Sequence, residues 1–100
     1  MKSSYRINWT NHALKELKEV FDYLETSWTE KELRKLSIEI EKTLELISRN
    51  PELFPKTRKK RNIRRVVITK HNTLYYRKNI ETIEIVSFFS NSKNTNKLKL

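Results

Sequence analysis

Residues 61–89 read R-N-I-R-R-V-V-I-T-K-H-N-T-L-Y-Y-R-K-N-I-E-T-I-E-I-V-S-F-F, and they carry the clearest strand signal of the chain. Three runs within it are rich in β-branched and aromatic residues, a composition typical of strands: residues 63–69, 73–78 and 82–89. Lys70-His71-Asn72 and Asn79-Ile80-Glu81 separate these runs, and each is short enough to form a tight hairpin turn. The stretch therefore predicts a three-stranded meander over residues 63–89.

Side chains of a strand point alternately to its two faces. This alternation places Leu74 and Tyr76 on one face of the middle strand and Thr73, Tyr75 and Arg77 on the other. In the last strand it places Ile83, Ile85, Ser87 and Phe89 on one, mainly apolar, face and Thr82, Glu84, Val86 and Phe88 on the other. A sheet that helices cover on one side has this pattern, so we take the polar face as the working surface.

The charge of the chain is concentrated in this half. The net charge is +10, and residues 1–50 carry nine lysines and arginines against nine acids. Residues 51–100 carry thirteen lysines and arginines against three acids, so they hold the whole excess. Such a one-sided field indicates an acidic partner, although it also favours solubility.

Composition excludes several kinds of function. A chain of 100 residues is expected to form one domain, here 1–100. It has no cysteine, so it has neither disulfides nor thiolate metal ligands, and it has no glycine, so phosphate-binding glycine loops are excluded. No apolar run reaches the roughly 20 residues of a membrane span, and the first residues lack a signal-peptide core. We therefore expect a cytoplasmic protein with no cofactor, no metal and no membrane partner.

The first half predicts a strand over 4–9 and a hairpin of two helices over 11–27 and 30–49. Thr10 or Asn11 is expected to cap the first helix, and Thr29 opens the second through a capping box with Glu32. The dipeptide Asn50-Pro51 ends it, because the residue before proline avoids helical backbone. Periodicity predicts that helices and sheet enclose Leu17, Phe21, Leu36, Ile40, Val67 and Ile85.

A basic linker over 50–62 joins the helices to the meander, and a polar tail over 90–100 follows it. Leu53-Phe54-Pro55 is expected to anchor the linker on the fold. A cluster of cations comes next, and it consists of Lys56, Arg58, Lys59, Lys60 and Arg61. Such a run is either a solvated loop or a contact for phosphate or an acidic partner.

Several short motifs, taken in this order and spacing, resemble the RelE/ParE superfamily of bacterial toxins. These are W-T-x-x-A from Trp9, N-P-E-L-F-P from Asn50, N-I-R-R from Asn62, L-Y-Y-R from Leu74 and I-E-I-V from Ile83. The resemblance covers almost the whole chain. It implies an α+β fold of order β-α-α-β-β-β, in which a twisted, mainly antiparallel sheet carries the helix hairpin on one face.

The resemblance also implies a toxin of a type II toxin-antitoxin module of the plasmid-stabilisation kind, held inactive by a cognate acidic antitoxin in a hetero-oligomer. The RelE-like branch of the superfamily cuts messenger RNA on the ribosome, and the ParE-like branch inhibits DNA gyrase. The N-I-R-R and L-Y-Y-R motifs are closer to the ParE-like branch.

The chemistry of RNA cleavage separates these branches. Without a metal it needs a cation for the scissile phosphate, a base for the 2′-hydroxyl and an acid for the leaving oxygen. The family's nucleases place an arginine before the L-x-Y of the middle strand and a basic group after the last strand. Here those positions hold Thr73 and Ser90-Asn91-Ser92. His71 lies in a turn, where an exposed structural role is the simpler interpretation.

We therefore expect a toxin that acts by binding gyrase and has no catalytic residue of its own. Residues expected to bind the target or antitoxin are Lys56, Arg58, Lys59, Lys60, Arg61, Arg64, Arg65, Tyr75 and Arg77. The alternative is a metal-independent endoribonuclease that acts on ribosome-bound mRNA, with active-site residues Arg64, Arg65, Tyr75, Arg77 and Lys93. A decayed toxin that keeps only antitoxin binding is a further alternative.

Overall fold

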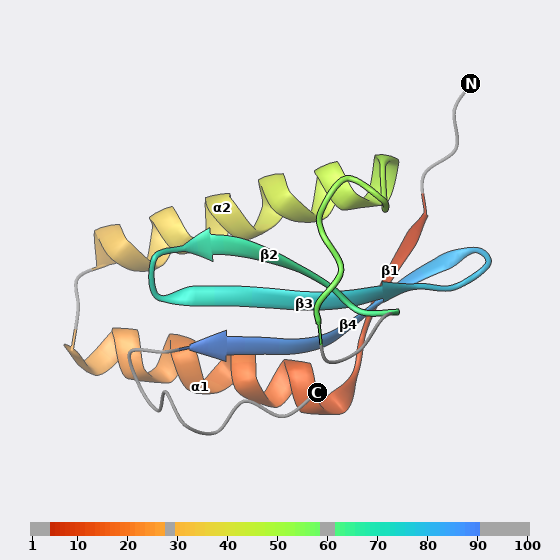
Figure 1. The fold of residues 1–100 in the computed structure, drawn as a ribbon. Coiled ribbons are helices and arrows are strands. Elements are labelled where there is room, and N and C mark those ends of the chain that lie inside the picture. The colour runs from red at the N-terminus through yellow and green to blue at the C-terminus, as the bar shows by residue number, and fades with distance from the viewer. Residues whose placement is uncertain (1–4, 28–29, 59–61, 91–100) are drawn as a thin grey trace.

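The computed structural model describes residues 5–27, 30–58 and 62–90. Its elements follow one another as β1 (Arg6–Trp9), α1 (Asn11–Ser27), α2 (Glu30–Arg49), β2 (Arg64–Thr69), β3 (Asn72–Lys78) and β4 (Thr82–Ser90). The strands form one sheet in the order β1-β4-β3-β2, as Figure 1 shows. Strand β1 is parallel to β4, and the other neighbours are antiparallel. The predicted α+β class and element order are confirmed.

Local capping explains where the helices begin and end. The Thr10 hydroxyl accepts a hydrogen bond from the Ala13 amide at 3.1 Å, so Thr10 rather than Asn11 is the N-cap of α1. Helix α2 ends at Arg49, directly before Asn50-Pro51. Thr29, predicted to cap α2, lies outside the described residues.

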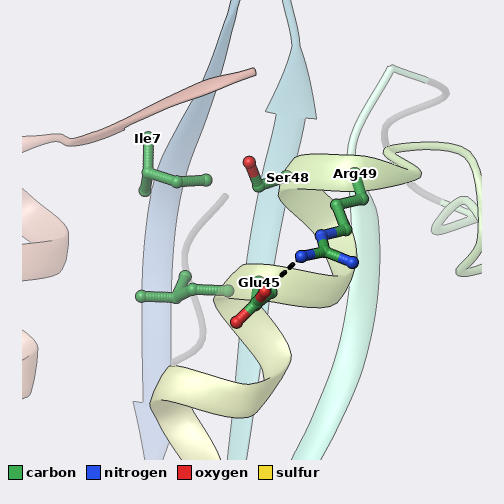
Figure 2. A pocket seen from close by; sticks show the side chains of 5 residues that line it. Ile7, Glu45, Ser48 and Arg49 are labelled. Carbon is green, nitrogen blue, oxygen red and sulfur yellow. Dashed lines mark ion pairs between the residues drawn. The ribbon is translucent and has the colours of Figure 1, made fainter. Parts of the chain in front are cut away.

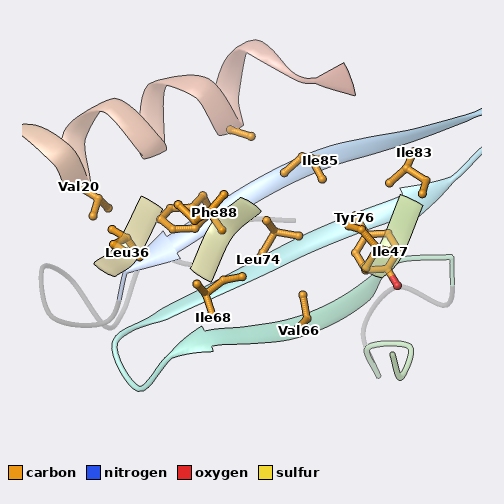
Figure 3. Close-up of a cluster of buried hydrophobic side chains, with 12 residues drawn as sticks. Val20, Leu36, Ile47, Val66, Ile68, Leu74, Tyr76, Ile83, Ile85 and Phe88 are labelled. Carbon is orange, nitrogen blue, oxygen red and sulfur yellow. The ribbon is translucent and has the colours of Figure 1, made fainter. Parts of the chain in front are cut away.

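One apolar core lies between the helix pair and one face of the sheet (Figure 3). The buried residues that form it are Ala13, Val20, Leu36, Ile40, Ile47, Val66, Ile68, Leu74, Tyr76, Ile83, Ile85 and Phe88. The core predictions are correct for Leu36, Ile40 and Ile85, and Leu17 and Phe21 pack against the cluster while partly buried. Because α1 and α2 both contribute to this single cluster, neither of the two described helices covers the opposite face of the sheet.

The core prediction for Val67 is wrong. Val67 is 55% exposed, whereas its neighbours Val66 and Ile68 are 7% and 8% exposed. Val66 lies opposite the fully buried Leu74, and Val67 lies opposite Thr73, which faces away from the helices. Successive side chains of a strand point to opposite faces, so an error of one residue reverses the assignment of faces. The prediction for β2 made this error when it placed Val67 in the core.

The predicted faces of β4 are also wrong at its C-terminal end. Tyr75 pairs with Ser87 but Tyr76 pairs with Ile85, so Val86 is an extra residue in β4. Such a bulge reverses the alternation beyond it. Phe88 is therefore in the core at 1% exposure, in place of the predicted Phe89.

The carboxylate of Glu16 closes the outer edge of β4 where β1 no longer pairs with it. Pairing between β1 and β4 ends at Trp9 and Ile85. Beyond this point Glu16 Oε1, from α1, accepts hydrogen bonds from the Phe88 amide and the Ser87 hydroxyl, both at 2.8 Å. A buried edge amide without a hydrogen-bond acceptor lowers the free energy of unfolding. The Glu16 carboxylate supplies the acceptor that a neighbouring strand would otherwise provide.

The turns of the described chain use ordinary backbone conformations. Within residues 5–27, 30–58 and 62–90 no residue has a positive φ angle. The short connections between β2, β3 and β4 therefore do not need glycine, which the chain lacks.

We predict different effects from the same change at two adjacent positions of β2. Val66→Ala removes buried methyl groups and should lower the free energy of unfolding by about 2 kcal/mol. Val67→Ala, at an exposed position, should change it by less than about 0.5 kcal/mol. Urea denaturation of both variants measures the difference, and equal effects would show that the faces of β2 are assigned incorrectly.

Candidate functional site

The face of the sheet opposite to α1 and α2 is the candidate working surface, and we call it the open face. Cross-strand partners share a face, so its members follow from the register. The open-face residues with the clearest assignment are Arg65, Val67, Thr73, Tyr75, Arg77, Glu84 and Asn8. Arg65 lies opposite Tyr75, and Arg77 follows two residues along β3, about 7 Å away. The structure thus brings together three predicted site residues, Arg65, Tyr75 and Arg77.

The charge of Arg77 is compensated within the open face. Its Nε atom lies 2.7 Å from Oε1 of Glu84, the residue opposite it on β4. The two side chains are 40% and 30% exposed, so solvent only partly screens the pair. The pair carries no net charge, which reduces its attraction for a phosphate.

The register assigns the Tyr75 side chain to the open face, but this side chain is buried. Its exposure is only 7%. Burial raises the pKa of the Tyr75 phenol, and the positive charge of Arg65 opposes part of that rise. The phenol is therefore neutral at physiological pH and is poorly suited to act as a base.

Arg64 faces the helices instead of the open face, because it lies opposite the buried Tyr76. Its Nη1 atom donates a hydrogen bond to the Phe54 carbonyl at 2.7 Å. The Tyr76 hydroxyl donates one to the Pro51 carbonyl, also at 2.7 Å. Burial raises the pKa of Tyr76, while Arg64 and the hydrogen bond involving the Phe54 backbone act in the opposite direction. Arg64 and Tyr76 together hold the start of the linker against the sheet.

The linker continues along the outer edge of β2. The Arg65 amide donates to the Pro55 carbonyl at 3.0 Å, and the Thr57 amide donates to the Ile63 carbonyl at 2.7 Å. Lys56 pairs with Arg64 at this edge, so its side chain lies on the side of Arg64 and that of Arg65 on the opposite side. Lys56, Arg58 and Arg65 are all exposed along this edge, and we call these three residues the basic edge. Lys59, Lys60, Arg61 and Lys93, also predicted as site residues, lie outside the described residues.

His71 lies far from the other candidate residues. It precedes β3, and six residues of extended chain, about 20 Å, separate it from Arg77. Its amide donates to the Thr69 hydroxyl at 3.2 Å, a contact within the turn. His71 and the Arg77–Glu84 pair therefore do not form one site.

A surface groove, which the sequence did not predict, lies between β1 and α2 (Figure 2). It has a volume of about 310 Å³ and is lined by Ile7, Leu44, Glu45, Ser48 and Arg49. Arg49 and Glu45 form an ion pair at 2.8 Å on its rim. The Ser48 hydroxyl donates to the Tyr5 carbonyl at 2.8 Å, which ties β1 to α2. We call this feature the β1–α2 groove. Its apolar lining is better suited to binding a side chain of a peptide than to catalysing a reaction.

Two features are absent from the residues that the structure describes, 5–27, 30–58 and 62–90. Neither α1 nor α2 carries an apolar stretch long enough to cross a membrane. Within the same residues, no three histidine or acidic side chains are grouped so that they would hold a metal ion.

Solved structures of bacterial toxins share this fold. A chain of the chromosomal ParDE TA system from P. aeruginosa matches with a TM-score of 0.72 and 12% identity, over 87% of this chain and 96% of that one. The YoeB dimer from Staphylococcus aureus matches with a TM-score of 0.61 and 20% identity, over 87% and 97%. The YoeB-YefM complex from the same species matches with a TM-score of 0.58 and 16% identity, over 85% and 94%.

The fold is thus that of the RelE/ParE superfamily of toxin-antitoxin toxins, as the motifs predicted. Residues 7–95 match the family described as the ParE toxin of type II toxin-antitoxin system, parDE. The chain therefore belongs to the ParE toxin family. No curated protein sequence matches it significantly.

We predict that the two adjacent arginines of β2 differ in their contribution to stability. Arg64→Ala removes the hydrogen bond to the Phe54 carbonyl and should lower the free energy of unfolding by about 1 to 2 kcal/mol. Arg65→Ala changes an exposed side chain and should alter it by less than about 0.5 kcal/mol. Chemical denaturation compares the two, and a larger loss in Arg65→Ala would contradict the assignment of their faces.

Proposed function

We propose that this toxin acts by binding and inhibiting DNA gyrase in the cytoplasm, and not by cutting RNA. The observation that carries the proposal is the Arg77–Glu84 ion pair at the centre of the open face. Membership in the ParE family and the sequence resemblance to the gyrase-directed branch support it further.

The open face offers little of the chemistry that RNA cleavage needs. Stabilising a scissile phosphate takes preorganised cations, and a base must be able to lose its proton near neutral pH. Arg77 is neutralised by Glu84, burial keeps Tyr75 protonated, and Thr73 carries no charge. Arg65 alone does not supply an acid, a base and a phosphate clamp. These residues are better suited to contacts with another protein.

We also propose that an acidic antitoxin covers the basic edge and the neighbouring surface of α2. Lys56, Arg58 and Arg65 are exposed there, and the β1–α2 groove provides an apolar recess at the C-terminal end of α2. The YoeB-YefM complex shows that a relative with this fold forms a complex. Lys59, Lys60 and Arg61 stay predicted members of this surface on the basis of sequence.

The antitoxin proposal predicts salt-dependent binding. The dissociation constant of the complex should rise as ionic strength rises, because salt screens attraction between exposed charges. The double variant Lys56→Ala/Arg58→Ala should weaken binding and flatten this dependence. The double variant Lys15→Ala/Lys18→Ala, which removes two exposed cations from α1 and thus outside the proposed antitoxin surface, is the matched control. Isothermal titration calorimetry at several salt concentrations measures both effects, and an unchanged dissociation constant would contradict the proposal.

Two parallel assays test gyrase inhibition against RNA cleavage. Purified toxin should inhibit supercoiling by gyrase from the same organism, or trap gyrase on cut DNA. In a translation mixture it should leave messenger RNA intact, as mapped by primer extension, because missing electrostatic contacts typically cost about two to three orders of magnitude in rate each. Arg65→Ala should weaken gyrase inhibition by removing an exposed contact.

The same assays identify the alternatives. Cuts phased with codons that disappear in Arg77→Ala or Tyr75→Phe would establish the endoribonuclease and overturn our proposal. Inactivity in both assays, with antitoxin binding retained, would identify a decayed toxin.

A further inference from the structure

The outer edge of β4 is covered in two different ways along its length. Strand β1 pairs with β4 only from Thr82 to Ile85. At Ile85 the Thr10 amide and hydroxyl both donate to the carbonyl, at 3.0 and 3.1 Å, and farther along Glu16 accepts from the Phe88 amide. Figure 1 shows α1 running along β4. Among the described residues, this half of the edge is thus covered by a helix and its side chains.

The segment under this cover has the composition of a strand that pairs with copies of itself. Residues 85–90 read I-V-S-F-F-S and contain no charged residue, proline or glycine. Short segments with high β propensity and no charge associate edge to edge when they become accessible. Proteins restrain such edges with bulges, with inward-pointing charges or with a covering helix. This half of β4 has the bulge at Val86, the carboxylate of Glu16 and the helix α1.

Glu16 fastens α1 to this edge through a charged acceptor. Its Oε1 atom accepts hydrogen bonds from the Ser87 hydroxyl and the Phe88 amide, and we call this contact the Glu16 latch. Its Oε2 atom lies 3.3 Å from Nε2 of His12, one turn earlier in α1. The Glu16 side chain is only 19% exposed, and hydrogen bonds to a charged group are stronger than those between neutral groups. Release of α1 from the β4 edge therefore breaks two strong hydrogen bonds.

The opposite edge of the sheet is protected by charge and by the linker. The Arg65 amide of β2 donates to the Pro55 carbonyl, and Lys56 and Arg58 are exposed along the same edge. With a net charge of +10, two copies of the chain repel each other where such cations meet. Residues 85–90 carry no cation, so two identical segments place no like charges opposite each other.

We propose that the Glu16 latch keeps residues 85–90 from pairing with the same segment of a second copy of this chain. While Glu16 holds α1 in place, the Phe88 amide is occupied and an incoming strand has no access to this edge. Without the latch, α1 separates locally from β4, and two β4 strands pair antiparallel through their outer edges across a twofold axis. The proposal concerns the free toxin and is independent of its cellular target.

The test compares full-length variants at Glu16 with a variant at Glu25, an exposed acid of α1. Deuterium exchange of the Phe88 amide, followed by NMR, should be at least about tenfold faster in Glu16→Ala, the factor that one lost hydrogen bond to a charged group represents. Sedimentation velocity over a range of concentrations should show self-association at least about tenfold tighter than that of the unaltered toxin. Glu25→Ala makes the same change in charge and should match the unaltered toxin in both measurements.

A second substitution identifies the surface through which the copies associate. Phe89 is partly exposed and lies opposite Thr73, on the open face. Phe89→Lys adds a cation to the segment in each copy, so Glu16→Ala/Phe89→Lys should associate no more tightly than the unaltered toxin. Val67→Lys adds the same charge to the open face of β2 and is the matched control. It should leave the association of Glu16→Ala unchanged.

Tighter association of Glu16→Ala that Phe89→Lys suppresses and Val67→Lys does not would support the latch. Unchanged exchange of the Phe88 amide, association no tighter than that of the unaltered toxin, or equal suppression by both lysines would each overturn it. Circular dichroism shows whether Glu16→Ala is folded. If it is not, Glu16→Gln, which keeps an oxygen acceptor but loses the charge, gives the answer: tighter association supports the latch, and unchanged association overturns it.

Discussion

The contact between Glu16 and the edge of β4 is the interaction on which the arrangement of this domain depends. Strand β1 has only four residues, so it leaves the second half of β4 without a strand neighbour on that side. Helix α1 takes that place, and one carboxylate oxygen of Glu16 receives both the Phe88 amide and the Ser87 hydroxyl. The same region contains the bulge at Val86, which directs Phe88 into the core. The edge contact and the bulge together fix how α1 packs on the sheet.

Sequence reasoning succeeded where the signal is local. Apolar spacing, Thr10 and Asn50-Pro51 specify the helices, and β-branched runs with short turns specify the meander. It failed where the outcome depends on pairing between strands. The run of Val66, Val67 and Ile68 is apolar throughout, so alternation alone does not show which residues face the helices.

The candidate site has the same division between local and long-range information. The sequence identified Arg65, Tyr75 and Arg77, but it did not distinguish Arg64 from Arg65, because adjacent arginines have the same chemistry and opposite faces. Pairing with Tyr76 and Tyr75 makes that distinction. The β1–α2 groove joins residues about forty positions apart, from Ile7 to Arg49, and no motif marks such a combination. The compensation of Arg77 by Glu84 likewise becomes visible only when β3 and β4 are placed side by side.

The backbone of the turns has a consequence for how this toxin changes over evolutionary time. Since no described residue requires a positive φ angle, any residue other than proline fits the β3–β4 turn without steric strain. The closing hydrogen bonds come from Asn79 and Thr82, which leaves position 80 outside the constraints of folding. Substitutions at this exposed position are therefore nearly neutral for stability. The sequence of this turn is therefore able to vary among proteins with this fold without any change in the core.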